Sequence, residues 1–325
     1  MSQAFLAQLR DDGVVVSPSA SLQPLKGGVS SDIYLVKDGD KRLVVKQALP
    51  QLRVTDEWYA DVARNITERE YMEFVSKTNP TSVPRVLAVG DGYFAMEYLG
   101  DEFKNWKVSM ICGRFSDAWA SRAGAFLGDV HKQSAGDEEL AQQFDKMDNF
   151  FQLRIEPYLL TAGSRHPSLE SIFKEEAERL RESKLALIHG DFSPKNILVS
   201  KDRLVVLDSE VACYADPAFD VAFLMSHLLL KLLYHKNYYS DIQSTIKHFL
   251  DAYGIQSMDF EYRVGKLMLL LLIARVDGKS PVEYLVFEDS KAFLRSFARL
   301  ELIQNPRGLN KIVDAWIEGV MSLQS

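Results

Sequence analysis

The chain has 325 residues, 47% of them hydrophobic and 26% charged, a composition typical of a globular protein with a large core. Its length favours about two domains, and its formal net charge of −7 argues against binding to nucleic acid. The two cysteines, Cys112 and Cys213, are too few for a disulfide framework or a metal cluster, and they favour a reducing cytoplasm.

Neither the start of the chain nor its apolar runs indicate a membrane protein. The first residues, MSQAFLAQLRDDG, lack the basic start and apolar core of a secretory signal. The longest purely apolar run, LMLLLLIA at 267–274, is too short to cross a bilayer. We therefore expect a cytoplasmic protein without a membrane partner, and we interpret 267–274 and 221–234 as parts of buried core helices.

The first hundred residues alternate short β-prone runs with turn residues. We expect strands at 22–28, 31–36, 42–49, 84–90 and 92–99. Between the third and fourth runs, the segment 61–77 has an apolar face at helical spacing and predicts a helix.

Long helical patterns dominate after residue 100. They predict helices near 116–131, 148–161, 168–183, 217–235, 240–253, 258–276, 289–302 and 309–322. The exception is 186–207, where short β-prone runs flank a polar loop. The sequence thus predicts an α+β fold with a small β-rich lobe, 1–98, a larger helical lobe, 99–325, and a ligand site in the cleft between them.

The polar loop lies within LIHGDFSPKNILV at 187–199. Asp191 is suited to accept or orient a hydroxyl proton, and Asn196, five residues later, offers a carbonyl oxygen to Mg²⁺. Twelve residues further on, LVVLDSE ends in Asp208 and Glu210. Asn196, Asp208 and Glu210 would supply the oxygen ligands that Mg²⁺ prefers. The alternative for any one of them is a residue that caps a loop.

Lys46 ends a β-prone run, from which its ammonium could reach nucleotide phosphates. Its carboxylate partner would come from the following helix. Glu68 lies on the core-facing side of that helix, and Glu70, one face over, is the alternative.

A glycine-rich turn, LKGGVSSD at 25–32, precedes this lysine. The backbone N–H groups of Gly27, Gly28, Ser30 and Ser31 could cover phosphates there. A plain hairpin turn is the alternative, because the pattern is not G-x-G-x-x-G.

Together these residues resemble the protein-kinase-like superfamily, in particular its aminoglycoside phosphotransferase and choline kinase branch. His189-Gly190-Asp191 with Asn196 is similar to the catalytic loop, and Asp208-Ser209-Glu210 stands where protein kinases have D-F-G. The resemblance spans roughly 20–235 and implies a two-lobed kinase-like fold that uses ATP and Mg²⁺.

Two further segments carry the resemblance. ADPAFDVA at 215–222 looks like the family segment whose last Asp, here Asp220, braces the catalytic loop, and His189 would brace it too. FAMEYLG at 94–100 looks like the hinge that receives adenine through its backbone, which implies roles for Met96, Glu97 and Tyr98.

The small lobe is also similar to the methylthioribose kinase family. The shared features are the run Lys46–Pro50, Trp58, Arg64 and Glu68, which favour Glu68 as the partner of Lys46. LDSE matches that family's D-x-E metal motif. The chain departs from the family in having Asn196 and in lacking the adjacent arginines that the family uses for its sugar.

The resemblance implies transfer of the γ-phosphate of ATP to a small alcohol. Asp191 would orient the acceptor hydroxyl and take its proton, while Lys46 neutralises the α- and β-phosphates. We expect a sugar-like acceptor in contact with Arg275, within ARVDGKSPVEYL at 274–285. A simple helix stop, with Gly278 as the cap and Pro281 beyond it, is the alternative for that segment.

Other activities fit the residues less well. An aminoglycoside would need an acidic pocket, and choline an aromatic cage, for which Tyr214, Tyr234, Tyr238 and Tyr239 are available. A pseudokinase scaffold is opposed by the filled catalytic positions. A protein kinase is opposed by the seven residues between Asp208 and Asp216, too few for a peptide platform. The sequence leaves the oligomeric state open, a homodimer included.

Overall fold

The computed structural model describes residues 2–25, 31–48, 64–255, 257–304 and 308–323. By their internal contacts the residues divide into two units. The N-terminal unit spans residues 1–103 and includes 205–210, and the C-terminal unit contains 104–204 and 211–325. The sequence predicted a boundary after residue 98, with 205–210 in the second lobe. The structure groups Asp208 and Glu210 with the β-rich unit instead.

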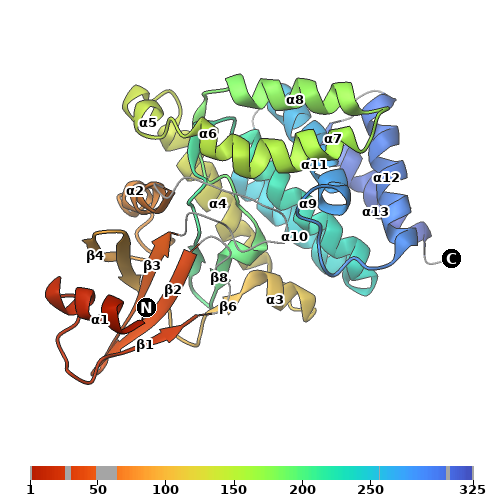
Figure 1. Ribbon diagram of the computed structural model, residues 1–325. Coiled ribbons are helices and arrows are strands. Elements are labelled where there is room, and N and C mark those ends of the chain that lie inside the picture. The colour runs from red at the N-terminus through yellow and green to blue at the C-terminus, as the bar shows by residue number, and fades with distance from the viewer. Residues whose placement is uncertain (1, 26–30, 49–63, 256, 305–307, 324–325) are drawn as a thin grey trace. The chain divides into compact units, whose positions relative to one another are not determined.

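The N-terminal unit is built on a five-stranded antiparallel sheet in the order β1-β2-β3-β5-β4 (Figure 1). Its strands are β1 (Ser21–Pro24), β2 (Ser31–Asp38), β3 (Lys41–Ala48), β4 (Val86–Gly90) and β5 (Tyr93–Glu97). Each strand overlaps one of the β-prone runs. In the central strand β3, the register sets Lys46 opposite Ile33 on one side and Phe94 on the other.

Two helices, α1 (Ser2–Asp11) and α2 (Arg64–Ser76), pack on the two faces of this sheet. Leu9 of α1 joins a core cluster with Val45 of β3 and Tyr93 of β5. Because neighbouring side chains on a strand point to opposite faces, Lys46 points to the other face, where it contacts α2. The sequence predicted α2 within 61–77 but gave no prediction for α1.

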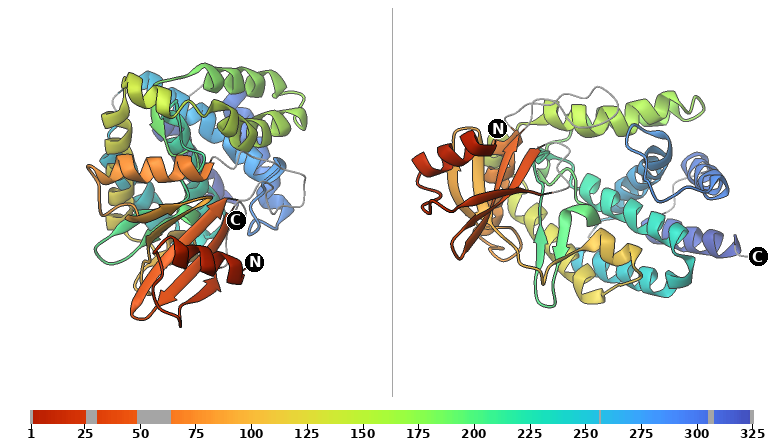
Figure 2. Two further views of the ribbon diagram at one scale, coloured as in Figure 1. Left: turned by 60° about the vertical axis from the view of Figure 1, so that its left-hand side comes forward. Right: turned by 60° about the horizontal axis from the view of Figure 1, so that its bottom comes forward.

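The C-terminal unit is mainly helical (Figure 2). The eight helices predicted for it correspond to α4 (Asp117–Ser134), α6 with the π-helix (Met147–Phe150 and Phe151–Leu160), α8 (Glu170–Glu182), α9 (Ala218–Tyr234), α10 (Tyr239–Tyr253), α11 (Met258–Asp277), α12 (Glu288–Ile303) and α13 (Leu309–Ser322). The short helices α3 (Trp106–Ile111), α5 (Glu138–Gln143) and α7 (Thr161–Ser164) were not predicted, since they are too short to show a period.

Helices α9 and α11 pack together and form the core of this unit. The apolar run 267–274 is fully buried in α11, which confirms it as part of a core helix. Helix α4 packs against α10, where a Cβ on Gly124 would lie 2.2 Å from the backbone oxygen of Phe249. Only glycine allows that close approach of the two helices.

Among the described residues, no single helix is long and apolar enough to cross a bilayer. Helices Ala218–Tyr234 and Lys236–Tyr253 meet the length and composition criteria only as a pair, and the chain bends by 116° between them.

Short strands frame the polar loop of the C-terminal unit. Strand β7 (Ala186–Ile188) pairs with β10 (Cys213–Ala215), and β8 (Ile197–Val199) pairs with β6 (Lys104–Asn105). The next strand, β9 (Leu204–Val206), begins with the last residue of 104–204 and continues into 205–210, which is assigned to the N-terminal unit. The loop between β7 and β8 ends in a 3₁₀ turn at Pro194–Asn196. Residues 189–196 are therefore fixed at both ends by paired strands.

Candidate active site

In the N-terminal unit, Lys46 makes two close ion pairs. Its Nζ lies 2.7 Å from Oε2 of Glu68 and 2.5 Å from Oδ1 of Asp208. Lys46 and Glu68 are both buried, whereas the side chain of Asp208 is 34% exposed. Of the two candidate partners, Glu68 is therefore the residue that pairs with Lys46.

Charge and burial act against each other in this group. Burial lowers the pKa of Lys46, but the carboxylates of Asp208 and Glu68 outweigh burial and hold it above its ordinary value. Burial raises the pKa of the Glu68 carboxyl, and the ammonium of Lys46 opposes that rise. The lysine therefore stays positively charged.

Asp208 has a left-handed backbone conformation. Its φ is +67°, a left-handed value that costs energy for any residue but glycine. Two residues later, Glu210 is buried and lies 3.2 Å from Nε of Arg64, at the start of α2. The acid that the sequence predicted as a magnesium ligand thus also anchors the helix that carries Glu68.

The remaining nucleotide-side predictions lie at strand ends. Met96 and Glu97 end β5 and pair with Val44 and Leu43 of β3. The hydroxyl of Tyr98 donates a hydrogen bond to Oδ1 of Asp101 at 3.4 Å. Ser31 begins β2. The predicted roles of Gly27, Gly28 and Ser30 fall outside the described residues.

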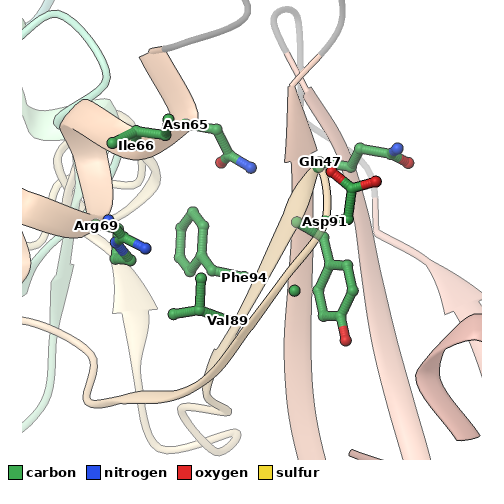
Figure 3. A pocket seen from close by; sticks show the side chains of 10 residues that line it. Gln47, Asn65, Ile66, Arg69, Val89, Asp91 and Phe94 are labelled. Atoms are coloured by element: carbon green, nitrogen blue, oxygen red, sulfur yellow. The ribbon is translucent and has the colours of Figure 1, made fainter. Parts of the chain in front are cut away.

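A pocket of about 470 Å³ also lies in this unit (Figure 3). It is lined from α2 by Asn65, Ile66 and Arg69, and its other walls come from β3 and the β4–β5 hairpin. Phe94 and Val89 give it an apolar floor, visible between the labelled polar side chains. Its lining does not include Lys46 or Asp208, but it includes Phe94, the β5 partner of Lys46, and Asn65, which donates to the Lys46 backbone oxygen.

In the C-terminal unit, Asp220 braces the polar loop. This buried carboxylate accepts hydrogen bonds from the backbone N–H groups of His189, at 2.6 Å, and Gly190, at 2.9 Å. Its Oδ2 also lies 3.3 Å from Nε2 of His131. His189 in turn accepts a hydrogen bond at Nδ1 from the backbone of Asp191. The loop is therefore held by side chains as well as by its flanking strands.

The glycine of His-Gly-Asp has a steric cause. Gly190 has φ +75°, and a Cβ there would lie 2.5 Å from the backbone oxygen of Val211. Only glycine fits this close, left-handed position. The tight turn lets the backbone on both sides of Gly190 reach Asp220 and His189.

Three side chains contact Asp191 itself. The amide nitrogen of Asn196 donates to the Asp191 backbone oxygen at 3.0 Å and to its Oδ2 at 2.8 Å. Arg154 and Lys195 place positive charges 3.0 and 2.9 Å from the same Oδ2. Since its nitrogen is turned to Asp191, Asn196 directs its carbonyl oxygen elsewhere, as a cation ligand would.

Arg154 and Lys195 were missed in the sequence. The position of Lys195 indicates a contact with the loop, because it directly precedes Asn196 and lies four residues after Asp191. The sequence indicates Arg154 less clearly, as a cation within the apolar stretch FQLRIEPYLL. It lies in a π-helix, an irregular form common at functional sites, and also donates to the backbone oxygen of Gly190 at 2.6 Å.

We expect Asp220→Asn to destabilise the unit and slow any reaction of the loop. An asparagine keeps the shape but offers only one acceptor to two backbone donors, which costs about 1–3 kcal/mol for the group left unsatisfied. Urea unfolding measures this loss. The control is Asp202→Asn, at an exposed turn position. Equal stability of the two variants would contradict the bracing role.

The 274–285 segment contains the helix stop that its sequence suggested, and it also buries Arg275. Helix α11 ends at Asp277 and Gly278 follows it, as a helix stop requires. Arg275 is nevertheless buried and donates to the hydroxyl of Tyr158 at 3.1 Å and to Ser280. Asp277 instead pairs with His166 and Arg295, outside this cluster.

The tyrosines considered for a choline cage do not gather at one point. Tyr214 is buried and donates to the backbone oxygen of Ser134 in α4. Tyr234 and Tyr238 both pack on the ring of His235 instead. This arrangement gives no cage that includes Tyr214.

Comparison with known proteins identifies the class to which this site belongs. The model of the phosphotransferase enzyme family matches residues 21–267, more than half of the chain. The chain therefore belongs to this family. This confirms the predicted class, a small-molecule phosphotransferase of the aminoglycoside phosphotransferase type.

Individual relatives are more distant. The chain is 23% identical over 262 residues to a methylthioribose kinase of Exiguobacterium sibiricum, covering 70% of this chain and 66% of that protein. It is 24% identical over 322 residues to a methylthioribose kinase of Bacillus cereus, covering 87% and 77%. The matched region therefore leaves about a quarter to a third of each relative uncovered.

A solved structure supports the fold. An amicoumacin kinase in complex with AMP-PNP, Ca²⁺ and Ami covers 96% of this chain and 100% of its own, with a TM-score of 0.57 and 12% identity. At this identity the likeness bears on the fold alone. It confirms the predicted α+β, two-lobed kinase-like fold.

Proposed function

We propose that this protein is an ATP-dependent kinase that transfers the γ-phosphate to a hydroxyl of a sugar-like metabolite. The observation that carries the proposal is the braced loop that presents Asp191 beside Asn196 and two cations. A scaffold without activity would have no need to hold a carboxylate in this way.

On the nucleotide side, the charged Lys46 binds the α- and β-phosphates and Glu68 fixes its position. Magnesium fits the oxygen donors available, namely the carboxylates of Asp208 and Glu210 and the carbonyl of Asn196. When bound, Mg²⁺ neutralises charge on the phosphates.

On the acceptor side, Asp191 accepts a hydrogen bond from the acceptor hydroxyl, directs it toward the γ-phosphorus and takes its proton late in the transfer. Arg154 and Lys195 hold the carboxylate in place through its Oδ2. The two cations also favour negative charge close to Asp191, where the transferred phosphoryl group arrives.

The metal role of Asp208 has a direct test. Asp208→Asn removes a charged ligand, so we expect the Mg²⁺ concentration for half-maximal activity to rise about tenfold or more. Glu210→Gln should raise it less. Magnesium titration of turnover measures both effects, with the exposed Glu73→Gln as control.

Glu210 has a second role that this titration separates. Because Glu210 pairs with Arg64, its substitution also removes an anchor of α2. If Glu210→Gln lowers thermal stability but leaves the magnesium dependence unchanged, Glu210 is structural and the D-x-E analogy does not hold here.

The sugar-like acceptor is supported by the relatives named methylthioribose kinase. Methylthioribose itself is a poorer candidate, because the chain has Asn196 and lacks an arginine pair. The alternative acceptors are aminoglycosides and amino alcohols such as choline. Both are cationic, and neither suits the two cations beside Asp191.

The proposal is tested by measuring ATP consumption of the purified protein with pentoses, sugar acids, aminoglycosides and amino alcohols. We expect turnover with pentoses or sugar acids. Turnover with aminoglycosides or choline alone would overturn the sugar assignment, and no turnover of ATP with any acceptor would favour a scaffold.

A further inference from the structure

A cluster of cations lies buried in the C-terminal unit. Lys231 of α9 is 1% exposed, and its Nζ lies 3.6 Å from the ring centre of Tyr284. Within the described part of the chain, the structure gives this ammonium no ion pair and no hydrogen bond. Tyr284 likewise has a buried hydroxyl without a hydrogen-bond partner there.

Arg275 adds a second charge without a counter-ion. Its hydrogen bonds go to neutral groups, the hydroxyl of Tyr158 and two oxygens of Ser280, and its buried Nε has no partner among the described residues. The acid in the neighbourhood, Glu283, is paired with Lys107. Two buried positive charges without a counter-ion reduce the stability of the fold, so a site of this kind is suited to bind an anion.

This cluster is continuous with the candidate base. The guanidinium of Arg275 bonds Tyr158, and the ring of Tyr158 lies 5.9 Å from the guanidinium of Arg154. Arg154 contacts Asp191 at 3.0 Å. Tyr158 and Arg154 thus link the cluster to Asp191 within one unit.

We propose that Lys231 and Arg275 form a subsite for an anionic group, a carboxylate or phosphate, on the acceptor molecule. This inference rests on the proposed function and specifies its acceptor class. The guanidinium suits a two-oxygen anion, and the Tyr284 hydroxyl adds a donor. Lys231 and Arg275 would repel a cationic acceptor, and Lys231 already lies over one face of the Tyr284 ring.

The state of Lys231 makes the subsite sensitive to pH. Burial, with help from Lys107 and Arg275 and against Glu283, lowers its pKa to about 7. Burial holds the pKa of His227 well below its ordinary value and raises the pKa of Tyr284. Both shifts move the titration of these two groups away from pH 7.

An anion binds the protonated lysine, so above pH 7 its binding must take up a proton. We therefore expect the acceptor KM to rise between pH 7 and 9. Lys231→Arg, which stays charged, should flatten this rise.

The decisive variant is Lys231→Met, which keeps the shape and removes the charge. We expect the melting temperature of the unliganded protein to rise by about 2 °C or more, since an uncompensated buried charge is gone. Gluconate and ribose 5-phosphate should each stabilise the wild-type protein in thermal shift, beyond ribitol and equal chloride, and should lose this effect in the variant. The two anions distinguish a carboxylate from a phosphate.

Lys174→Met, at an exposed position on α8, is the matched control and should behave as wild type. A lower melting temperature in Lys231→Met, or anion effects equal to those of wild type, would overturn the subsite. This binding readout needs no turnover. Anion binding that depends on Lys231 would therefore support the subsite even if no acceptor is phosphorylated, whereas turnover of neutral sugars unaffected by Lys231→Met would refute the subsite alone.

Discussion

Replacing Asp191 by Asn is expected to lower kcat by about 10²–10⁴-fold while nucleotide binding is retained. The substitution removes the carboxylate that orients the acceptor hydroxyl and takes its proton. It keeps the shape that Asn196, Arg154 and Lys195 contact. Steady-state kinetics with the best acceptor measures the loss, and titration with an ATP analogue measures nucleotide binding.

The control for this variant is again Asp202→Asn, which carries the same chemical change at an exposed turn. Melting curves are needed beside the kinetics, because Asp191→Asn leaves Arg154 and Lys195 without their counter-charge. A folded Asp191→Asn protein that keeps more than about a tenth of wild-type turnover would contradict the role given to Asp191.

Lys46→Met is expected to raise the KM for ATP and to lower kcat together, the latter by about 10²–10³-fold. The ammonium of Lys46 is the buried positive charge in the N-terminal unit that Glu68 and Asp208 hold in place. Its removal takes a fixed charge away from both the bound phosphates and the transition state.

Lys41→Met, at an exposed position on the same strand β3, is the matched control and should leave both constants unchanged. Glu68→Gln should weaken ATP binding less than Lys46→Met, since it loosens the lysine without removing it. If Lys46→Met lowers only the yield or the melting temperature of the protein, Lys46 is structural.

The short-range part of this site could be predicted from the sequence. Lys46 ends a β-prone run, and Glu68 lies on the inner face of the next helix, so the alternation of strands and the period of helices bring them together. His189, Asp191 and Asn196 lie within one loop, where sequence spacing fixes their distances. Asp220 required the family resemblance, because nothing local links it to the loop.

Other contacts depend on packing that no local pattern encodes. Arg154 reaches Asp191 from a π-helix, whose side chains leave the ordinary helical positions. The sequence places Lys231 with His227 on a core helix, and only the fold brings Lys231 beside Tyr284. Arg275 was found because it directly follows an apolar run, where a charge is conspicuous.

The pairing of Glu210 with Arg64 was also beyond the sequence. The D-x-E spacing indicated a metal ligand, while the structure adds an ion pair to the helix that carries Glu68. The predicted metal role and the ion pair would use the same carboxylate, so spacing alone could not separate them.

The central claim, phosphate transfer to a small molecule by Asp191, is tested most directly with γ-labelled ATP and a protein-free extract of small metabolites. Wild-type protein and Asp191→Asn are incubated in parallel, and label is measured separately in the small-molecule and protein fractions. We predict label in an anionic sugar-like product with the wild type and almost none with the variant. Label in protein, or equal labelling by the two proteins, would contradict the account.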